Sequence, residues 1–264
     1  MTSSKVKPGS KLYPTDPVAA TEGAVSSWFS LAHPSTVITG SGYSSVHDLL
    51  NPSSPLTQGT DNRRPPNATS NNGLPIITSS TAFMTCPVIA ARTNTTTWGF
   101  WGWFKQSTTA DSIQSFHTTS STGTDVNRDF LFFRSSGASL RFRVFATDAS
   151  SRDNDVSGLT AAQWNFFTVE FNGSRSADAR SIITVNGAVP SQAYGTSTGV
   201  TEIPATLRTV TGNGAAIGLG SGGPFFVGSV GTNFGFLGSA MSGASEGLLT
   251  QQARLALMNY QRPT

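Results

Sequence analysis

The clearest hydrophobic pattern in the chain lies in residues 98–105, where aromatic side chains fall on both faces of an extended segment. A run that is apolar on both alternating faces predicts a strand in the middle of a layered β structure. Gly99 and Gly102 disfavour a helix, since two glycines cost it about 2 kcal/mol, and they leave room for rings of a neighbouring sheet. The aromatic residues of one face are Trp98, Phe100 and Phe104, and those of the other are Trp101 and Trp103.

Residues 129–134 and 140–146 flank a polar loop and predict a β-hairpin. In the second arm of this hairpin, apolar residues alternate with Arg141 and Arg143. This alternation is typical of a strand with one face in water. Both arginines are therefore expected on the solvent side.

Residues 164–171 repeat the alternation and predict a second strand of the same kind, with Thr168 and Glu170 on its wet face. The next apolar run, residues 181–185, ends at an Asn-Gly pair that indicates a tight turn. Near the end of the chain, Thr250 is a suitable N-cap for a helix over residues 251–260 that packs on the sandwich. The other predicted elements are strands at residues 28–31, 83–89, 113–117, 225–230 and 234–237, one helical turn at 46–50, and a helix stop at Pro263.

We expect residues 28–264 to form one β-sandwich domain and residues 1–27 to form an extended N-terminal attachment arm. A length of 264 residues suits one large all-β domain with an ample core. Prolines at positions 8, 14 and 17 prevent regular structure in the arm. Such an arm is expected to lie on a neighbouring chain of an assembly; the alternative is that it folds back on its own sandwich.

Charged residues make up 12% of the chain, about half of the usual quarter. Ser, Thr, Asn and Gly must therefore supply the polar surface, a composition found in β-sandwiches and in proteins exposed outside cells. The formal charge of +3 is mild, and the sequence lacks the dense basic patch of a nucleic-acid-binding protein.

The single cysteine, Cys86, excludes an internal disulfide and is interpreted as a core residue rather than a catalytic thiol. The N-terminus lacks the apolar segment of a signal peptide. No run approaches the roughly 18 apolar residues of a membrane span. We therefore expect a protein made in a cytoplasm and not exported by the common route.

Short motifs that follow one another along the chain resemble those of a known fold family. They are Trp-Gly-Trp-Phe-Lys (101–105), Arg-Asp-Phe-Leu-Phe (128–132), Trp-Asn-Phe-Phe-Thr-Val (164–169), Val-Asn-Gly (185–187), Ile-Gly (217–218), Phe-Phe-Val-Gly-Ser-Val-Gly (225–231) and Leu-Leu-Thr-Gln-Gln-Ala-Arg (248–254), with upstream segments at 28–37, 56–65 and 72–75. Together they resemble the laminin-G-like, concanavalin A-like jelly-roll domains of the kind found in bacteriophage virion proteins. The resemblance covers residues 28–262.

This resemblance implies an all-β fold, a two-sheet antiparallel jelly-roll sandwich with about six strands in each sheet. Members of the family commonly bind glycans or proteins, and some bind calcium through loop carboxylates. Residues 30–32 are Ser-Leu-Ala where an Asp is frequent in the family, which argues against an inherited metal site. The Glu-x-Asp-x-x-Glu motif of related glycosidases is absent.

Catalytic chemistry has little support in the sequence. Glu22, Glu170, Glu202 and Glu246 are the only glutamates, and no two lie at strand spacing, so a paired-carboxylate hydrolase has no local signature. His33, His47 and His117 are isolated; His47 and Asp48 suggest a relay, but neighbours in one helical turn do not face each other.

Two charged groups are candidate binding sites. Asp153 and Asp155 in a loop, with Asp148 as a third oxygen ligand, suit calcium, although Asp and Asn also favour turns for purely local reasons. A stripe of arginines on the hairpin fits an acidic partner or an anionic glycan, and its alternative is a solvated strand face. The stripe comprises Arg128, Arg134, Arg141 and Arg143.

The leading hypothesis from the sequence is a non-enzymatic virion structural protein, of the capsid decoration or tail and head-fibre type. It would be made in the host cytoplasm without a signal peptide and fastened by residues 1–27 to other capsid or tail proteins in a multi-copy assembly. The alternative is a carbohydrate-binding module that adsorbs to host surface glycans, and the second alternative is a glycoside hydrolase. We expect no catalytic, cofactor or metal site, no nucleic-acid partner and no membrane span.

Overall fold

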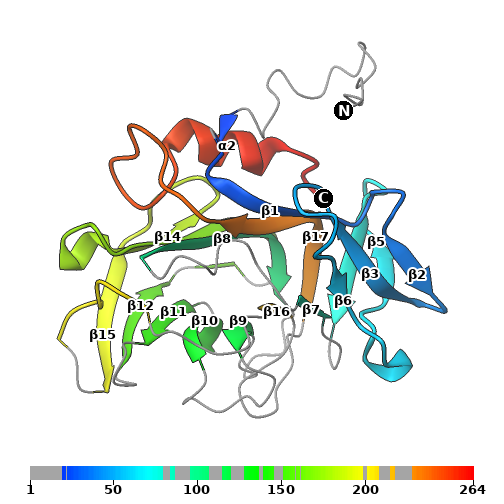
Figure 1. Ribbon diagram of the computed structural model, residues 1–264, viewed down its shortest axis with the longest axis horizontal. Coiled ribbons are helices and arrows are strands. Elements are labelled where there is room, and N and C mark those ends of the chain that lie inside the picture. Colours follow the sequence, from blue (N-terminus) through cyan, green and yellow to red (C-terminus); the bar gives the residue numbers. More distant parts are fainter. Residues whose placement is uncertain are drawn as a thin grey trace.

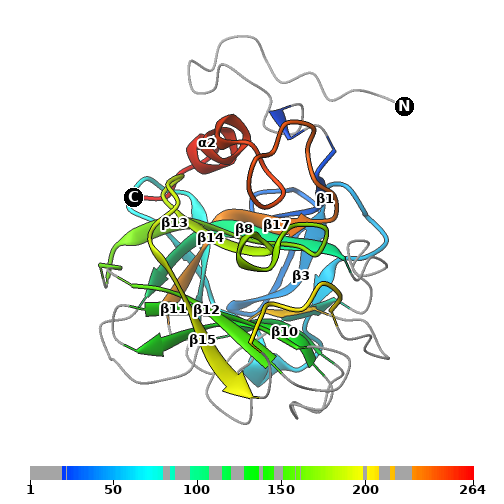
Figure 2. The ribbon, with the colours of Figure 1, turned by 90° about the vertical axis from the view of Figure 1, so that its left-hand side faces the viewer.

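In the computed structural model, two antiparallel sheets face each other and one short helix, α2 (Gln251–Asn259), covers the outer side of one sheet (Figures 1 and 2). Every strand pairing among the described residues is antiparallel, which confirms the predicted all-β sandwich. The structure describes residues 20, 21, 23–79, 84–86, 96–106, 115–119, 128–136, 139–145, 151–157, 159, 160, 162–198, 201–207, 215–217 and 228–264.

Sheet A is the middle layer of the molecule (Figure 2). Its order is β14–β13–β8–β17, and the far side of β17 pairs with β1 along one half and with β6 along the other. The aromatic strand β8 therefore lies in the interior of sheet A, as the sequence predicted. The strands of sheet A are β1 (Val25–Ser30), β5 (Asn67–Thr69), β6 (Pro75–Ser79), β8 (Thr97–Gln106), β13 (Trp164–Asn172), β14 (Ser181–Val185) and β17 (Gly228–Leu237).

Sheet B is the second layer, and its outer face is turned away from sheet A. Its order is β2–β3–β4–β7–β16–β9–β10–β11–β12–β15. The end of β3 also pairs with β1, which joins the two sheets on one side. The strands of sheet B are β2 (Val37–Thr39), β3 (Gly42–Asp48), β4 (Leu56–Thr57), β7 (Met84–Cys86), β9 (Ser115–Thr119), β10 (Arg128–Ser136), β11 (Ser139–Phe145), β12 (Ser151–Val156), β15 (Gln192–Thr198) and β16 (Ala215–Ile217).

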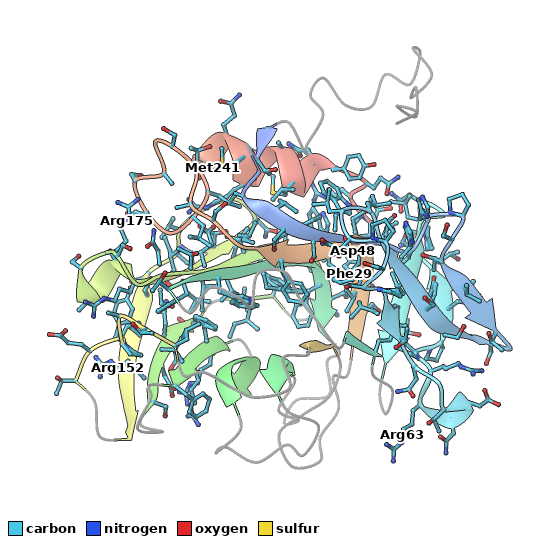
Figure 3. The ribbon with its side chains drawn as sticks, in the orientation of Figure 1. Phe29, Asp48, Arg63, Arg152, Arg175 and Met241 are labelled. Carbon is cyan, nitrogen blue, oxygen red and sulfur yellow. The ribbon has the colours of Figure 1, made fainter. Side chains whose placement is uncertain are left out.

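Two hydrophobic cores lie on opposite faces of β8, as its two aromatic faces require. The inner core fills the space between the sheets and contains Phe100 and Phe29. The outer core lies between sheet A and α2 and contains Trp101 and Met241. Figure 3 labels one residue of each core: Phe29 of the inner core lies near β1, and Met241 of the outer core lies beside α2. Sheet A is therefore covered on both faces, and sheet B is covered on its inner face.

The outer core is covered by residues 238–250 together with α2, and we call this segment the cap. Thr250 caps the helix, since its side-chain Oγ1 accepts a hydrogen bond from the Ala253 backbone N–H at 3.2 Å, and the predicted N-cap is confirmed. The helix ends at Asn259, so Pro263 does not stop it. Among the described residues, α2 is the longest helix, and no helix is long and apolar enough to cross a membrane.

Several local predictions are corrected by long-range pairing. Residues 46–48 belong to β3 and not to a helical turn, because β3 pairs with β1, β2 and β4. Residues 228–237 form one strand with an irregularity between Val230 and Phe234, and not two strands. The room at Gly102 is taken by Phe234 of the adjacent strand β17, and not by a ring of the facing sheet.

The start of the sandwich differs from the boundary expected from the sequence. β1 begins at Val25, and both Ala24 and Val25 lie in the outer core. Residues 25–27, which the sequence assigned to the arm, are thus part of a strand. Residues 1–19 lie outside the described residues, and their role as an attachment arm stays a prediction.

Candidate functional site

Four charged side chains form a ladder on the outer face of sheet B. Arg141 and Arg143 lie on β11, opposite Asp155 and Asp153 of β12 in the strand register. The residues that alternate with the arginines, such as Phe142, are in the inner core. Because side chains on a strand alternate between the two faces, the arginines and their aspartates share the outer face, as the sequence predicted for Arg141 and Arg143.

Each arginine of the ladder donates two hydrogen bonds to its own aspartate. Arg141 donates from Nε and Nη2 to the two oxygens of Asp155, both at 2.7 Å. Arg143 donates in the same way to Asp153, at 2.7 and 3.0 Å. Nη1 of Arg141 also lies 3.0 Å from Asp153, so the ladder is continuous. Two-point pairing of this kind fixes the orientation of both partners.

Exposure differs within the ladder. The Asp153 side chain is 3% exposed, whereas those of Asp155, Arg143 and Arg141 are 23%, 23% and 28% exposed. Asp153 is the buried centre, and the other three reach solvent. The hydrogen bond to Asp155, with the charges of Asp153 and Asp155, raises the pKa of Arg141 and outweighs the opposite effect of partial burial.

The ladder is flanked by small residues on the edge strand β15. Ala193 is opposite Asp155, and Gly195 is opposite Asp153, so both share the outer face. Ala193 is exposed, and no atom lies within 4 Å of where a Gly195 side chain would begin. The surface beside the aspartates is therefore open. We call these two residues and the four ladder residues the ladder face.

The calcium hypothesis placed Asp153 and Asp155 in a loop, and this is wrong. Both lie in β12 because the strand is paired on its two sides, with β11 and with β15. The carboxylate oxygens that would bind calcium accept hydrogen bonds from guanidinium groups. Asn154 between them points to the inner face, where it donates to Ser181 of β14. Asp148 lies outside the described residues.

The predicted stripe of basic charge is partly neutralised in the structure. Arg141 and Arg143 are matched by two carboxylates, so this part of the face carries no net charge. The backbones of Arg128 and Arg134 lie in β10, and their side chains lie outside the described residues. No group of three or more potential metal ligands occurs in the described part of the chain.

His47 and Asp48 do not form the relay that their adjacency in the sequence suggested. The rings of His33 and His47 stack at a centroid distance of 4.3 Å, while Asp48 points away and accepts hydrogen bonds from the backbone N–H groups of Trp28 and Leu50. Burial, and secondly the charge of His47, lower the pKa of His33. The side chains of His117 and Cys86 lie outside the described residues.

A second arginine–carboxylate pair, Glu170 and Arg254, connects sheet A to the cap. Glu170 of β13 was expected on a wet face, and this is wrong because the cap covers it: its side chain is 0% exposed and that of Arg254 is 5% exposed. Glu170 accepts from Nε and Nη2 of Arg254 at 2.8 and 3.0 Å, from Thr168, and from the backbone N–H groups of Leu248 and Leu249. This site is buried and structural.

Comparison with known proteins finds solved structures with a similar fold. No protein-family model matches the sequence, and no curated protein matches it. The binding domain of botulinum neurotoxin serotype D has a TM-score of 0.54 at 8% identity, over 91% of this chain and 51% of that one. A botulinum neurotoxin DC binding domain in complex with SialylT has a TM-score of 0.54 at 8% identity, over 82% and 48%.

A sialidase of Trypanosoma rangeli, in complex with a difluoro-KDN compound, has a TM-score of 0.52 at 10% identity, over 90% of this chain and 33% of that one. At these identities the likeness shows the fold alone, a jelly-roll-like β-sandwich. The chain spans about half of the neurotoxin binding domains and about a third of the sialidase.

The ladder could be found only in part from the sequence. The alternation of Arg141 and Arg143 signalled their face, but nothing local linked them to residues 153 and 155. One further signal was available: Asp153 and Asp155 have the same spacing of two as the arginines, and such spacing fits cross-strand pairing of opposite charges.

Proposed function

We propose that this protein is a carbohydrate-binding module and that the ladder face is its binding surface. The observation that carries the proposal is an open sheet face on which fixed, partly exposed donors and acceptors lie beside small residues. Sugars present many hydroxyl groups, each of which donates and accepts hydrogen bonds. Side chains held by two-point pairing lose little freedom when a ligand binds, which lowers the cost of binding.

The architecture is compatible with this proposal, and the pairing of the carboxylates argues against a glycosidase. Jelly-roll sandwiches occur in both lectin and viral capsid domains, and the similar solved structures include binding domains, one of them in complex with SialylT. Among the described carboxylates, Asp153, Asp155 and Glu170 all pair with arginine, which disfavours them as proton donors in a glycosidase. The virion role and the attachment arm stay predictions.

The kinds of side chain on the ladder face indicate how a sugar would be bound. Among the described residues, the exposed large hydrophobic side chains are all aliphatic, and the six residues of the ladder face include no aromatic ring. Recognition on the ladder face thus rests on hydrogen bonds. Affinity for a single sugar is then low, and binding to repeated sugars on a surface gains from several copies of the module.

A glycan array tests the proposal directly. The purified full chain is applied to an array of neutral and sialylated oligosaccharides, with and without calcium, beside the variant Gly195→Trp. A tryptophan at this position projects from the open face without touching the core, so we expect a folded protein with lost binding. Calcium is expected to have no effect, since the aspartates are paired with arginine.

The matched control is Gly59→Trp. Gly59 also has open space around it, and it follows β4, which several strands separate from β12 in sheet B. Should Gly195→Trp lower the melting temperature, Ala193→Tyr replaces it, because Ala193 is exposed on the same face. Silence of the whole array, or equal binding by the Gly195 and Gly59 variants, would overturn the proposal.

A further inference from the structure

The charges of the ladder cancel within the face itself. Arg141 and Arg143 supply two positive charges, and Asp153 and Asp155 supply two negative ones, within 3.0 Å of each other. A stripe of unpaired arginines would attract an anionic ligand, and the sequence by itself suggested such a stripe. The paired ladder has no such attraction.

The aspartate most accessible to a ligand is Asp155. Each of its two oxygens accepts one hydrogen bond from Arg141, and an ionised carboxylate offers about four acceptor positions. Its side chain is 23% exposed, against 3% for Asp153. Asp155 can thus accept further hydrogen bonds from hydroxyl donors without releasing Arg141.

We infer that the ladder face selects neutral sugars and discriminates against acidic ones. A sugar hydroxyl donates to a remaining acceptor position of Asp155, and the small exposed side chain of Ala193 leaves room for the sugar ring beside it. This inference rests on the proposed function, because it assigns a ligand class to the same face.

An acidic sugar meets the opposite situation. Its carboxylate would lie against that of Asp155, and like charges repel each other. Arg141 already donates two hydrogen bonds at 2.7 Å to Asp155, so an acidic sugar would compete with a carboxylate that is already in place. The SialylT bound in the neurotoxin DC structure therefore does not predict the ligand of this chain.

The test compares lactose with 3′-sialyllactose, which differ by one acidic residue, together with the best neutral hit of the array, by calorimetric titration of the full chain. We expect 3′-sialyllactose to bind about tenfold more weakly than lactose. The sialylated form of the best neutral hit should likewise bind more weakly than the hit itself. Asp155→Asn should weaken the neutral sugar about tenfold, the size of one charge-assisted hydrogen bond. It should also reduce the discrimination, because the ladder then has two arginines and one aspartate and carries one net positive charge.

Glu202→Gln is the control, since it removes one negative charge at an exposed position outside the ladder face. Melting temperatures of both variants show whether they fold. Stronger binding of sialylated sugars by the wild type, with loss in Gly195→Trp, would overturn the inference and leave the proposed function standing. Equal affinities of Asp155→Asn and Glu202→Gln for the neutral sugar would also overturn it. Absence of all glycan binding would instead reject the proposed function.

Discussion

The two arginine–carboxylate clusters of this protein use the same chemistry at different depths. Glu170 of sheet A and Arg254 of the cap are buried against each other, and backbone N–H groups of the cap also donate to Glu170. The ladder lies on the outer face of sheet B, where three of its four side chains reach solvent. Removal of one partner leaves a charge without water in the first cluster and a solvated charge in the second.

This difference separates stability from recognition. A buried pair cannot meet a ligand, and its hydrogen-bonding positions are filled by the chain itself. A partly exposed pair contributes little to folding but retains acceptor positions for a ligand. Variants in the two clusters should therefore affect different measurements, and the following predictions run from the largest effect to the smallest.

The largest effect is expected for Arg254→Met. The substitution leaves the Glu170 carboxylate buried without its cation, which costs about 3–5 kcal/mol of unfolding free energy. Urea denaturation measures the loss. The double variant Glu170→Gln with Arg254→Met removes both charges and should recover part of it. A loss below about 1 kcal/mol in the single variant would show that the cap does not depend on this pair.

A smaller effect is expected for Asp153→Asn at the buried centre of the ladder. Asp153 accepts from both Arg141 and Arg143, so its neutralisation leaves two arginines short of charge. We expect a loss of about 1.5–3 kcal/mol, the range for hydrogen bonds to charged groups. The same denaturation assay applies, and a loss equal to that of Arg254→Met would remove the contrast between the clusters.

Asp155→Asn should change stability by less than about 1 kcal/mol, since exposed ion pairs contribute little. The difference from wild type should shrink further in 1 M NaCl, where charges are screened beyond about 3 Å. Sugar affinity should change while stability does not, which is the reverse of the expectation for Arg254→Met. A salt-independent loss of several kcal/mol would place Asp155 with the buried cluster instead.

The smallest effect on stability is expected from a change of pH, through His33, which belongs to neither cluster. The pKa of His33 is lowered by burial and by His47, so the folded state binds its proton less readily than the unfolded state. Its contribution to stability is complete above the unfolded pKa of about 6.5 and is lost as pH falls toward the folded value. Urea midpoints between pH 7.5 and 5 measure the decline.

His33→Asn serves as the comparison for this titration. Its amide oxygen can replace Nδ1 of His33, which accepts a hydrogen bond from the Ser35 backbone N–H, but it does not titrate. The variant should show a flatter pH dependence, and NMR titration of His33 in the wild type should report the lowered pKa directly. An unchanged slope in the variant would assign the pH dependence to other groups.

The two clusters also differ in how far the sequence foretold them. The faces of residues 141 and 143 followed from alternation alone, because strand geometry has a period of two. The partners of these residues did not follow, because a turn signal was taken from Asp-Asn-Asp although the segment is paired on both sides. For Glu170 the alternation gave the correct face, but the cap that buries this face comes from residues 238–259.

By itself, the sequence determined the elements whose causes are local. The two-sided aromatic strand at Trp98–Lys105, the Asn186-Gly187 turn and the Thr250 N-cap depend on side-chain period, positive φ and a nearby backbone donor. The tertiary structure alone decided which polar faces meet water and which charges meet each other. The physical reason is distance along the chain: solvent exposure and ion pairing depend on what packs against a strand, and here those partners are up to 84 residues away in sequence.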